Sequence, residues 1–502
     1  MNQTIKIFGP PGTGKTTRLL NEVANYLARG FQPEEIGFVS FTRQAAEEAK
    51  SRAHVRFGFS RKRLLNFRTL HSMAFGMLAL NRESVIKTEH YQEIARACGF
   101  EVSARAARMN SEEGLWIGAT RGDKILFLEN MARISSSSID SVLETSEFDD
   151  IEKLEVEVWA KALKSFKEAN ALMDFTDMLN DWLKHGTVPF LKVLFVDEAQ
   201  DLSRLQWHMV RKMAQQSLDL WLAGDDDQAI FRWSGASPDE FVNFPGETVV
   251  LHQSYRVPKV VHALAMDIRA NIDGSLPKEY APREEQGLLD FYDELEQVDM
   301  SEGKWLVLVR NNYLVSMVEE NCRRLGFWYD SLFDPPTKCT RPILNWHRFL
   351  KGERLTITEM EEVLKMCGRT INIKKEYDKS EFLQDYEREE RTISEAITES
   401  RPWFDVFQDM SVEKRTYYRS VLARKEDIRG TPRIRISTIH GAKGGEEDNV
   451  VLITDMSNKT YEKMAIDLSN EHRVFYVAVT RAKVTLHVVK PQTDKCLPIF
   501  AL

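Results

Sequence analysis

Short apolar runs recur along the chain, and within most of them polar and apolar residues do not alternate. Such runs are typical of parallel strands that are covered on both faces. Helical patterns, for example over residues 16–28 and 43–52, lie between many of the runs. This alternation predicts α/β layers with parallel sheets. The expected strands are residues 5–8, 36–40, 193–196, 218–223, 249–251, 305–309, 434–438, 450–454 and 486–489.

Two regions, residues 82–168 and 339–429, break this rhythm. Both have helical periodicity with few strand signals, and the second is densely charged, as in residues 387–391. We expect two mainly helical insertions within α/β domains. A chain of 502 residues is too long for one hydrophobic core, so two or more domains are predicted.

Residues 9–16 read GPPGTGKT and match the phosphate-loop pattern GxxxxGK[ST] in full. The segment follows an expected strand and opens an expected helix, which a glycine-rich turn with a chance lysine does not explain. Lys15 is expected to reach the β- and γ-phosphates, and the Thr16 hydroxyl is expected to bind Mg²⁺. The residues expected to bind the nucleotide here are Gly9, Pro10, Pro11, Gly12, Thr13, Gly14, Lys15, Thr16 and Thr17.

An acid pair, Asp197 and Glu198, ends the apolar run 193–196. Carboxylates at the carboxyl end of a parallel strand face the crevice where ligands bind. We expect Asp197 to hold Mg²⁺ and Glu198 to act as the general base on the attacking water. Acid pairs also cap strands, but together with the phosphate loop this pair predicts a nucleoside triphosphatase.

Five further segments, in order along the chain, resemble motif boxes of the UvrD/Rep family of superfamily 1 helicases. They are residues 197–201 (DEAQD), 224–236 (GDDDQAIFRWSGA), 253–256 (QSYR), 437–444 (STIHGAKG) and 471–482 (EHRVFYVAVTRA). Two shorter segments, residues 41–46 (FTRQAA) and 69–72 (TLHS), resemble two more boxes of the same family. The resemblance spans nearly the whole chain.

The resemblance implies two tandem RecA-like α/β motor domains with parallel sheets, each interrupted by a mainly helical insertion. The first motor domain is expected at residues 1–81 and 169–252, with its insertion at 82–168. The second is expected at residues 253–338 and 430–502, with a reduced insertion at 339–429. The implied activity is that of an ATP- and Mg²⁺-dependent DNA helicase that moves 3′→5′ along single-stranded DNA and unwinds duplex. The polarity follows from the residue 224–236 box, because the opposite-polarity branch usually has a GDxxQLPP-like segment there.

Roles at the nucleotide are carried over by position. The resemblance implies that Gln228 senses the γ-phosphate and that Tyr255 stacks on the nucleotide base. Arg256 and Arg481 would contact the γ-phosphate from the second motor domain, and Glu446 would hydrogen-bond the ribose. Arginine suits this task because its guanidinium stays charged and binds phosphate oxygens in pairs, although most arginines form surface ion pairs.

The implied DNA contacts are stacking aromatic side chains and phosphate ligands, which grip a strand without reading its sequence. Trp233 lies where the family stacks a base, although a buried core tryptophan is the alternative. His71 could equally be a structural hydrogen-bonding residue. The residues expected to bind DNA are Phe41, Thr42, Arg43, Thr69, His71, Phe231, Trp233 and His440.

The net charge of −8 by itself argues against a nucleic-acid partner. The charges are uneven, however, because residues 43–68 hold eight Lys or Arg and two acidic residues. This basic run is either a phosphate-binding track between two motifs or a solvated surface. The five cysteines include no CxxC pair, and no apolar stretch is long enough to span a bilayer. A cytoplasmic, DNA-associated protein with reduced thiols is expected.

Several positions depart from the family pattern. Phe231 stands where the family usually has a tyrosine, Ser234 replaces an arginine, and residues 445–447 read GEE instead of LEF. No nuclease-like segment follows Arg481, which disfavours a helicase–nuclease subunit. Two alternatives remain open: a translocase that strips proteins from single strands without unwinding duplex, and a non-motor phosphate-loop switch or binding protein. Expected partners are single-stranded DNA, single-strand/duplex junctions and replication or repair proteins of unknown identity.

Overall fold

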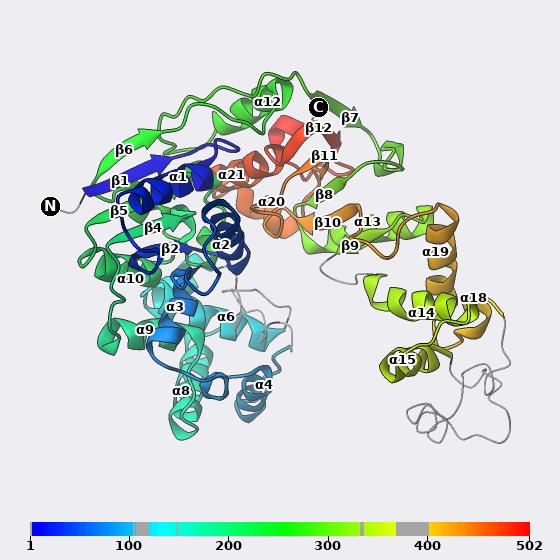
Figure 1. Ribbon diagram of the computed structural model, residues 1–502, viewed down its shortest axis with the longest axis horizontal. Helices are drawn as coiled ribbons and strands as arrows, with labels where there is room; N and C mark the ends of the chain where they lie inside the picture. Colours follow the sequence, from blue (N-terminus) through cyan, green and yellow to red (C-terminus); the bar gives the residue numbers. More distant parts are fainter. Residues whose placement is uncertain are drawn as a thin grey trace. The chain divides into compact units, whose positions relative to one another are not determined.

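The computed structural model describes residues 3–103, 106, 120–146, 148, 150–331, 336–367 and 401–501. The chain divides into two compact units. The first comprises Met1–Glu285 with Ser469–Thr480, and the second comprises Gln286–Leu468 with Arg481–Leu502. Figure 1 labels most of the helices and strands of each unit with the names used below.

The first unit is built on a six-stranded parallel sheet with strand order β3-β2-β4-β5-β1-β6. Its strands carry few polar side chains in their interiors, because helices cover both faces of the sheet. They are β1 (Gln3–Phe8), β2 (Ile36–Ser40), β3 (Phe67–Thr69), β4 (Val193–Asp197), β5 (Asp219–Gly224) and β6 (Glu247–Val250).

Apolar residues of alternate strand positions enter two separate cores. One core joins the sheet to α1 and α2, and the other joins it to α3, α9 and α10. The helices of this unit outside its insertion are α1 (Lys15–Ala28), α2 (Arg43–Phe57), α3 (Leu70–Met77), α9 (Phe175–His185), α10 (Arg204–Ala214), α11 (Pro238–Val242), α12 (Lys259–Arg269) and α21 (Leu468–Val479).

The described part of the first insertion is helical, as predicted. It consists of α4 (Thr88–Ala97), α6 (Arg121–Ile134), α7 (Ile139–Thr145) and α8 (Lys153–Ala169). These helices surround a core of their own, which includes Trp159, Leu163 and Phe127.

The second unit is built on another six-stranded parallel sheet, with strand order β7-β12-β11-β8-β10-β9. Its strands are β7 (Leu288–Tyr292), β8 (Trp305–Val309), β9 (Tyr329–Ser331), β10 (Ile434–Thr438), β11 (Glu447–Ile453) and β12 (Ala482–Val489). Its helices are α13 (Asn312–Leu325), α14 (Thr340–Leu350), α15 (Ile357–Cys367), α18 (Trp403–Val406), α19 (Val412–Ala423) and α20 (Asn458–Met464).

The second insertion, unlike the first, shares its core with the sheet. Residues of α14, α15, α18 and α19 pack in one cluster with residues of β8 and β10. The charged segment 387–391 lies outside the described residues. Short 3₁₀ turns complete the two units: η1 (Pro33–Glu35), η2 (Arg82–Ser84), η3 (Ala199–Asp201), η4 (Asp226–Gln228), η5 (Arg232–Ser234), η6 (Leu295–Gln297), η7 (Pro336–Cys339) and η8 (Pro498–Phe500).

The predicted α/β class with two parallel sheets is confirmed, and each of the nine expected strands overlaps an observed one. Three strands, β3, β7 and β9, were not predicted. All three lie at sheet edges, where a strand is short or carries exposed side chains and therefore lacks a continuous apolar run. The first compact unit extends to Glu285, so it includes residues 253–285, which the sequence analysis assigned to the second motor domain. The predicted domain boundaries stay predictions.

The five cysteines, all of them within the described residues, form no disulfide. None of the helices in the described ranges is both long enough and apolar enough to cross a membrane.

Candidate active site

The phosphate loop lies between the carboxyl end of β1 and the first turn of α1, as the sequence predicts. Gly12 has a φ of 73°, and a Cβ atom there would collide with the Cβ of Arg256, so only glycine fits. The loop is closed by two bonds, from Thr13 Oγ1 to the Pro10 carbonyl at 2.7 Å and from Lys15 Nζ to the Gly9 carbonyl at 2.7 Å. The amide groups at the α1 N-terminus form a natural phosphate-binding site. The remaining predicted members of this site, Pro11, Gly14, Thr16 and Thr17, lie in the same loop and helix turn.

The two predicted metal ligands are in direct contact. Thr16 Oγ1 donates a hydrogen bond of 2.6 Å to Oδ2 of Asp197, the last residue of β4. Burial, and next the neighbouring Glu198 carboxylate, raise the pKa of Asp197 to about 6. The Thr16 hydroxyl and the Lys15 ammonium oppose this rise in the pKa only in part. A hydroxyl beside such a carboxylate is a fitting set of oxygen ligands for Mg²⁺.

Glu198, the expected general base, has a left-handed backbone with a φ of 53°. This conformation is costly for a residue with a side chain and is concentrated at functional sites. Its Oε2 atom accepts a hydrogen bond of 2.6 Å from Gln200 Nε2. The side chain is therefore held in one orientation at the carboxyl edge of the sheet.

Gln200 bridges the acid pair to the loop after β5, a role that the sequence analysis did not identify. Its Oε1 accepts a hydrogen bond of 2.9 Å from the backbone N–H of Asp225. A Cβ atom at Gly224 would lie only 2.6 Å from this oxygen, so the bridge requires glycine there. Gln228, the expected γ-phosphate sensor, donates from Nε2 to Asp225 Oδ2 at 2.7 Å. The glutamine in the DEAQD segment was the available signal, because a buried amide at that position needs partners.

Tyr255 and Arg256 lie against the phosphate loop within the first unit. The Tyr255 N–H donates to the Gly12 carbonyl at 2.9 Å, and Ser254 Oγ donates to the Pro11 carbonyl at 2.8 Å. The Tyr255 side chain is 74% exposed, which leaves its ring open for a stacking partner. Both residues thus belong to the same compact unit as Lys15, although the sequence analysis placed Arg256 on the second motor domain.

Arg481 and Glu446 are brought together in the second unit. They immediately precede β12 and β11, which are neighbouring parallel strands. Arg481 is only 2% exposed and donates to the Gly445 carbonyl at 3.4 Å, while Glu446 lies 3.9 Å from Lys483 Nζ.

Four aromatic rings form a row across the first unit, here called the aromatic row. The ring centroids of Phe41 and Phe231 are 5.6 Å apart, and those of Phe231 and Trp233 are 6.4 Å apart. Trp233 then stacks on Phe127 of α6 at 6.3 Å with an interplanar angle of 18°. Trp233 is partly buried and packs against the insertion core, so it is neither a fully exposed platform nor an ordinary core residue. Phe127 lies in none of the motifs and was not predicted as part of the site.

Two predicted DNA-binding threonines already cap helices. Thr42 Oγ1 accepts a bond from the Ala45 N–H at 3.1 Å, and Thr69 Oγ1 accepts one from the Ser72 N–H at 3.2 Å. Each hydroxyl still has its proton to donate to a phosphate. Arg43 is exposed at the first position of α2.

The two predicted histidines occupy different surroundings. His71 is partly buried, with its ring 5.8 Å from that of Phe175. Burial lowers the pKa of His71 to about 4, and the nearby Asp174 opposes this only in part. The imidazole is therefore neutral at pH 7. His440 follows β10 in the second unit and is also partly buried.

The basic run 43–68 is less available to phosphates than its sequence suggests. Arg52 and Arg61 form ion pairs with Glu48 and Glu47, and Arg63 pairs with Glu34 at 2.7 Å. Arg68 donates to the carbonyl groups of residues 65 and 72. For much of the run, these contacts favour the interpretation as a solvated surface over the interpretation as a phosphate-binding track.

Comparison with known proteins agrees with the family resemblance of the motifs. The UvrD/REP helicase N-terminal domain matches residues 1–248, and the UvrD-like helicase C-terminal domain matches residues 151–493. The chain is 26% identical over 269 residues to the ATP-dependent DNA helicase Rep of Escherichia coli, covering 50% of this chain and 38% of that protein. It is 25% identical over 300 residues to the ATP-dependent DNA helicase PcrA of Bacillus subtilis, covering 55% of this chain and 39% of that protein. With DNA helicase II of Escherichia coli it shares 27% identity over 292 residues, or 54% and 39% of the two chains. The chain thus spans about two fifths of the length of these relatives.

Proposed function

This chain belongs to the UvrD/Rep-like family of helicases, and we propose from that premise that it is an ATP-driven DNA motor. The motor moves 3′→5′ along single-stranded DNA and unwinds duplex at single-strand/duplex junctions. The observation that carries the proposal is the loop 224–236, which connects Gln228 through Asp225 and Gln200 to Glu198 and also holds Trp233 in the aromatic row. One short segment therefore touches both candidate sites.

In the proposed reaction, the phosphate loop binds the triphosphate of ATP through its amide groups and Lys15. Thr16 and Asp197 would hold Mg²⁺, which would supply positive charge to the phosphate groups. Glu198 takes a proton from the attacking water, and its bond to Gln200 fixes the carboxylate for that task. Gln228 hydrogen-bonds the γ-phosphate and thus distinguishes ATP from ADP.

Two arginines complete the charge around the γ-phosphate in this proposal. Arg256 is supported by its contact with the phosphate loop, and Arg481 is supported by its position in the family motif. A guanidinium that binds two phosphate oxygens stabilises the transition state of phosphoryl transfer. Tyr255 stacks on the nucleotide base, and Glu446 binds the ribose.

The aromatic row and its neighbours grip the strand. Bases stack on Trp233 and Phe231 regardless of sequence, because every base presents a π-face. Thr42, Arg43 and Thr69 donate to backbone phosphates, and His71 and His440 add hydrogen bonds. Closing of the nucleotide site moves the loop 224–236, and each turnover thereby shifts the grip on DNA.

The 3′→5′ direction rests on the motif at residues 224–236, which resembles the UvrD/Rep branch. Single-turnover unwinding of duplexes with a 3′ tail, a 5′ tail or no tail tests it. We expect unwinding of the 3′-tailed duplex alone. Unwinding from the 5′ tail would contradict the direction. Protein displacement from single strands without unwinding would favour the translocase, and ATP hydrolysis that ignores DNA would favour the switch.

A further inference from the structure

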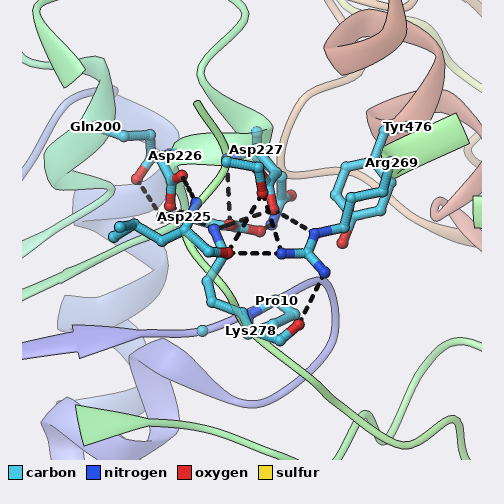
Figure 2. A network of polar contacts seen from close by, with 12 residues as sticks. Pro10, Gln200, Asp225, Asp226, Asp227, Arg269, Lys278 and Tyr476 are labelled. Atoms are coloured by element: carbon cyan, nitrogen blue, oxygen red, sulfur yellow. Dashed lines mark hydrogen bonds and ion pairs between the residues drawn. The ribbon is translucent and has the colours of Figure 1, made fainter. Parts of the chain in front are cut away.

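A cluster of buried charges lies beside the candidate active site, and its cations belong to none of the motifs (Figure 2). Acidic residues 225–227, here called the acid triplet, follow β5 and are almost fully buried. Lys278, which is 2% exposed, places Nζ 2.8 Å from Asp225 Oδ1 and 3.0 Å from Asp227 Oδ2, and it also contacts Asp226. Arg269 Nε lies 2.6 Å from Asp227 Oδ2. Two cations thus hold three consecutive carboxylates.

The charge on Lys278 is what allows the acid triplet to stay buried. Burial alone lowers the pKa of the Lys278 ammonium, but the three carboxylates more than offset this, and its pKa lies above the usual value. Lys278 is therefore a cation at neutral pH. Without it, buried carboxylates would have to take up protons or move toward water.

The acid triplet is bonded to the side chains that are proposed to act on ATP. Asp225 Oδ1 accepts a hydrogen bond from Lys278 Nζ, and Asp225 Oδ2 accepts one of 2.7 Å from Gln228 Nε2. The N–H of the same residue donates to Gln200, whose amide donates to Glu198 at 2.6 Å. A displacement of Asp225 therefore moves both the proposed γ-phosphate sensor and the support of the proposed base.

Arg269, the last residue of α12, shapes the loop that carries Lys278. Its guanidinium donates to the carbonyl groups of Lys278 at 2.9 Å and Leu276 at 2.8 Å, and to Ser275 Oγ at 3.0 Å. Figure 2 shows Arg269 and Lys278 approaching the acid triplet, with Tyr476 of α21 nearby. The loop 275–278 is thus folded onto the triplet by one arginine.

We propose that Lys278 is a positioning residue for ATP hydrolysis, which fixes Gln228 and Glu198 through Asp225, and that Arg269 holds Lys278 in place. The inference rests on the proposed function, because it presupposes that these side chains act on ATP. Lys278 acts through the acid triplet, so its loss should lower the rate of hydrolysis more than the affinity for nucleotide.

A second cluster with the same number of cations and carboxylates, and largely buried, provides a matched control. Lys167 of α8 lies 2.6 Å from Asp174 and 2.5 Å from Asp177, and Arg133 lies 2.8 Å from Asp174 and 2.6 Å from Glu129. This cluster also has two cations and three carboxylates, but its contacts join helices α6, α8 and α9.

The test compares Lys278→Met with Lys167→Met in the full chain, with three measurements on each: Tm, kcat for ATP hydrolysis with single-stranded DNA, and Kd for a non-hydrolysable ATP analogue. Both substitutions should lower Tm. Only Lys278→Met should lower kcat, by about 10- to 100-fold, with the analogue Kd changed by less than about 3-fold, because small misplacements cost rate before binding. Lys278→Arg, which keeps the charge, should recover part of kcat.

Arg269→Gln is the milder companion variant, because it removes the charge but keeps an amide donor for the loop carbonyls. It should lower kcat by about 3- to 10-fold, and it decides the question if Lys278→Met does not fold. A kcat equal to that of Lys167→Met, in whichever of the two variants folds, would overturn the positioning role.

Hydrolysis is also measured without DNA. A wild-type chain that hydrolyses ATP but ignores DNA contradicts the proposed motor and leaves the positioning test intact, whereas a chain that hydrolyses no ATP contradicts both.

Discussion

The two sheets have the same number of strands and are both parallel. They differ in the strand ends at which their candidate functional residues lie. In the first sheet, the phosphate loop, the acid pair, the loop 224–236 and Phe41 all follow strand carboxyl ends. In the second sheet, Glu446 and Arg481 precede strands at the amino edge, whereas His440 follows β10 at the carboxyl edge. In the first sheet, the candidate functional residues all lie at the carboxyl ends of the strands. In the second sheet, they lie at both ends of the strands.

The strand order of the first sheet places the candidate nucleotide residues next to the candidate DNA residues. The nucleotide residues lie at β4, β5 and β1, and the DNA candidates Phe41 and Thr69 lie at the neighbouring β2 and β3. The loop after β5 reaches from one group to the other, since it carries Gln228 and Phe231. In the proposed function, the first sheet thus holds most of the nucleotide site at the carboxyl ends of its strands. The second sheet is suited to add single contacts, and the following predictions test this division.

The largest effect is expected for Lys15→Ala, which removes the main cation of the phosphate loop. ATP turnover should fall to background, and affinity for the nucleotide should fall with it, because the β/γ-phosphates lose their charge partner. Nucleotide binding by equilibrium dialysis and phosphate release measure both quantities. Retained turnover would show that the first sheet does not carry the site.

Glu198→Gln should separate binding from chemistry at the same edge. An amide cannot accept the proton of the attacking water, and loss of a general base costs about 10²- to 10⁴-fold in rate. ATP affinity should stay close to that of the wild type. Single-turnover hydrolysis of bound ATP checks this, and a near-normal rate would place the base elsewhere.

Arg481→Ala tests the second sheet directly. If this sheet only adds a contact to the γ-phosphate, ATP should still bind while hydrolysis falls by about 10²-fold, as for loss of one transition-state donor. Nucleotide Kd and kcat are measured together. Loss of binding as complete as in Lys15→Ala would break the comparison, since the nucleotide site would then need both sheets equally.

Trp233→Ala should weaken single-stranded DNA binding more than DNA-independent ATP hydrolysis. One stacked base contributes about 1–3 kcal/mol, equivalent to about a 5- to 150-fold loss of affinity. Phe127→Leu is the control, because it disturbs the packing of Trp233 on the insertion but keeps the indole ring. Unchanged DNA affinity in Trp233→Ala together with a lower Tm would assign the residue to the core.

The smallest effect concerns His71 at the β3 end of the first sheet. Its pKa of about 4 in the folded protein lies below the usual 6.5, so the unfolded chain binds more protons between these values. Stability contributed by the neutral ring is therefore lost as pH falls from 6.5 toward 4. His71→Gln should reduce the loss of unfolding free energy between pH 7 and pH 5 by on the order of 1 kcal/mol, measured by denaturant titration. If the unfolding free energies of both proteins changed equally with pH, the pKa of His71 would not be lowered in the folded protein.

The interior strands and the phosphate loop could be predicted because their signals are local. Buried parallel strands such as β8 read as unbroken apolar runs, and the phosphate loop has fixed spacing between two recognisable elements. The helix caps at Thr42 and Thr69 are also local, but the sequence analysis assigned both threonines to DNA binding and did not identify the caps. The edge strand β7, whose residues are mostly exposed, has no such signal.

The cluster formed by the acid triplet, Arg269 and Lys278 could not be predicted, because its cations are distant in sequence from its carboxylates. Lys278 pairs with carboxylates more than fifty residues away, and nothing in the sequence around a single lysine indicates that it is buried. The charge of the basic run 43–68 was misjudged for the opposite reason, because the ion-pair partner of Arg52 is close in sequence. Arg52 meets Glu48 one helical turn away, a spacing at which opposite charges pair, so summing the basic residues overestimated the charge available to DNA.

ATP hydrolysis by the wild-type chain, titrated with single-stranded DNA, tests the central claim most directly. If one loop couples the nucleotide site to the aromatic row, kcat should rise with DNA and saturate, and duplex DNA without tails should not substitute. A rate that stays the same from zero to saturating single-stranded DNA would contradict the account, because Gln228 and Trp233 would then not be coupled.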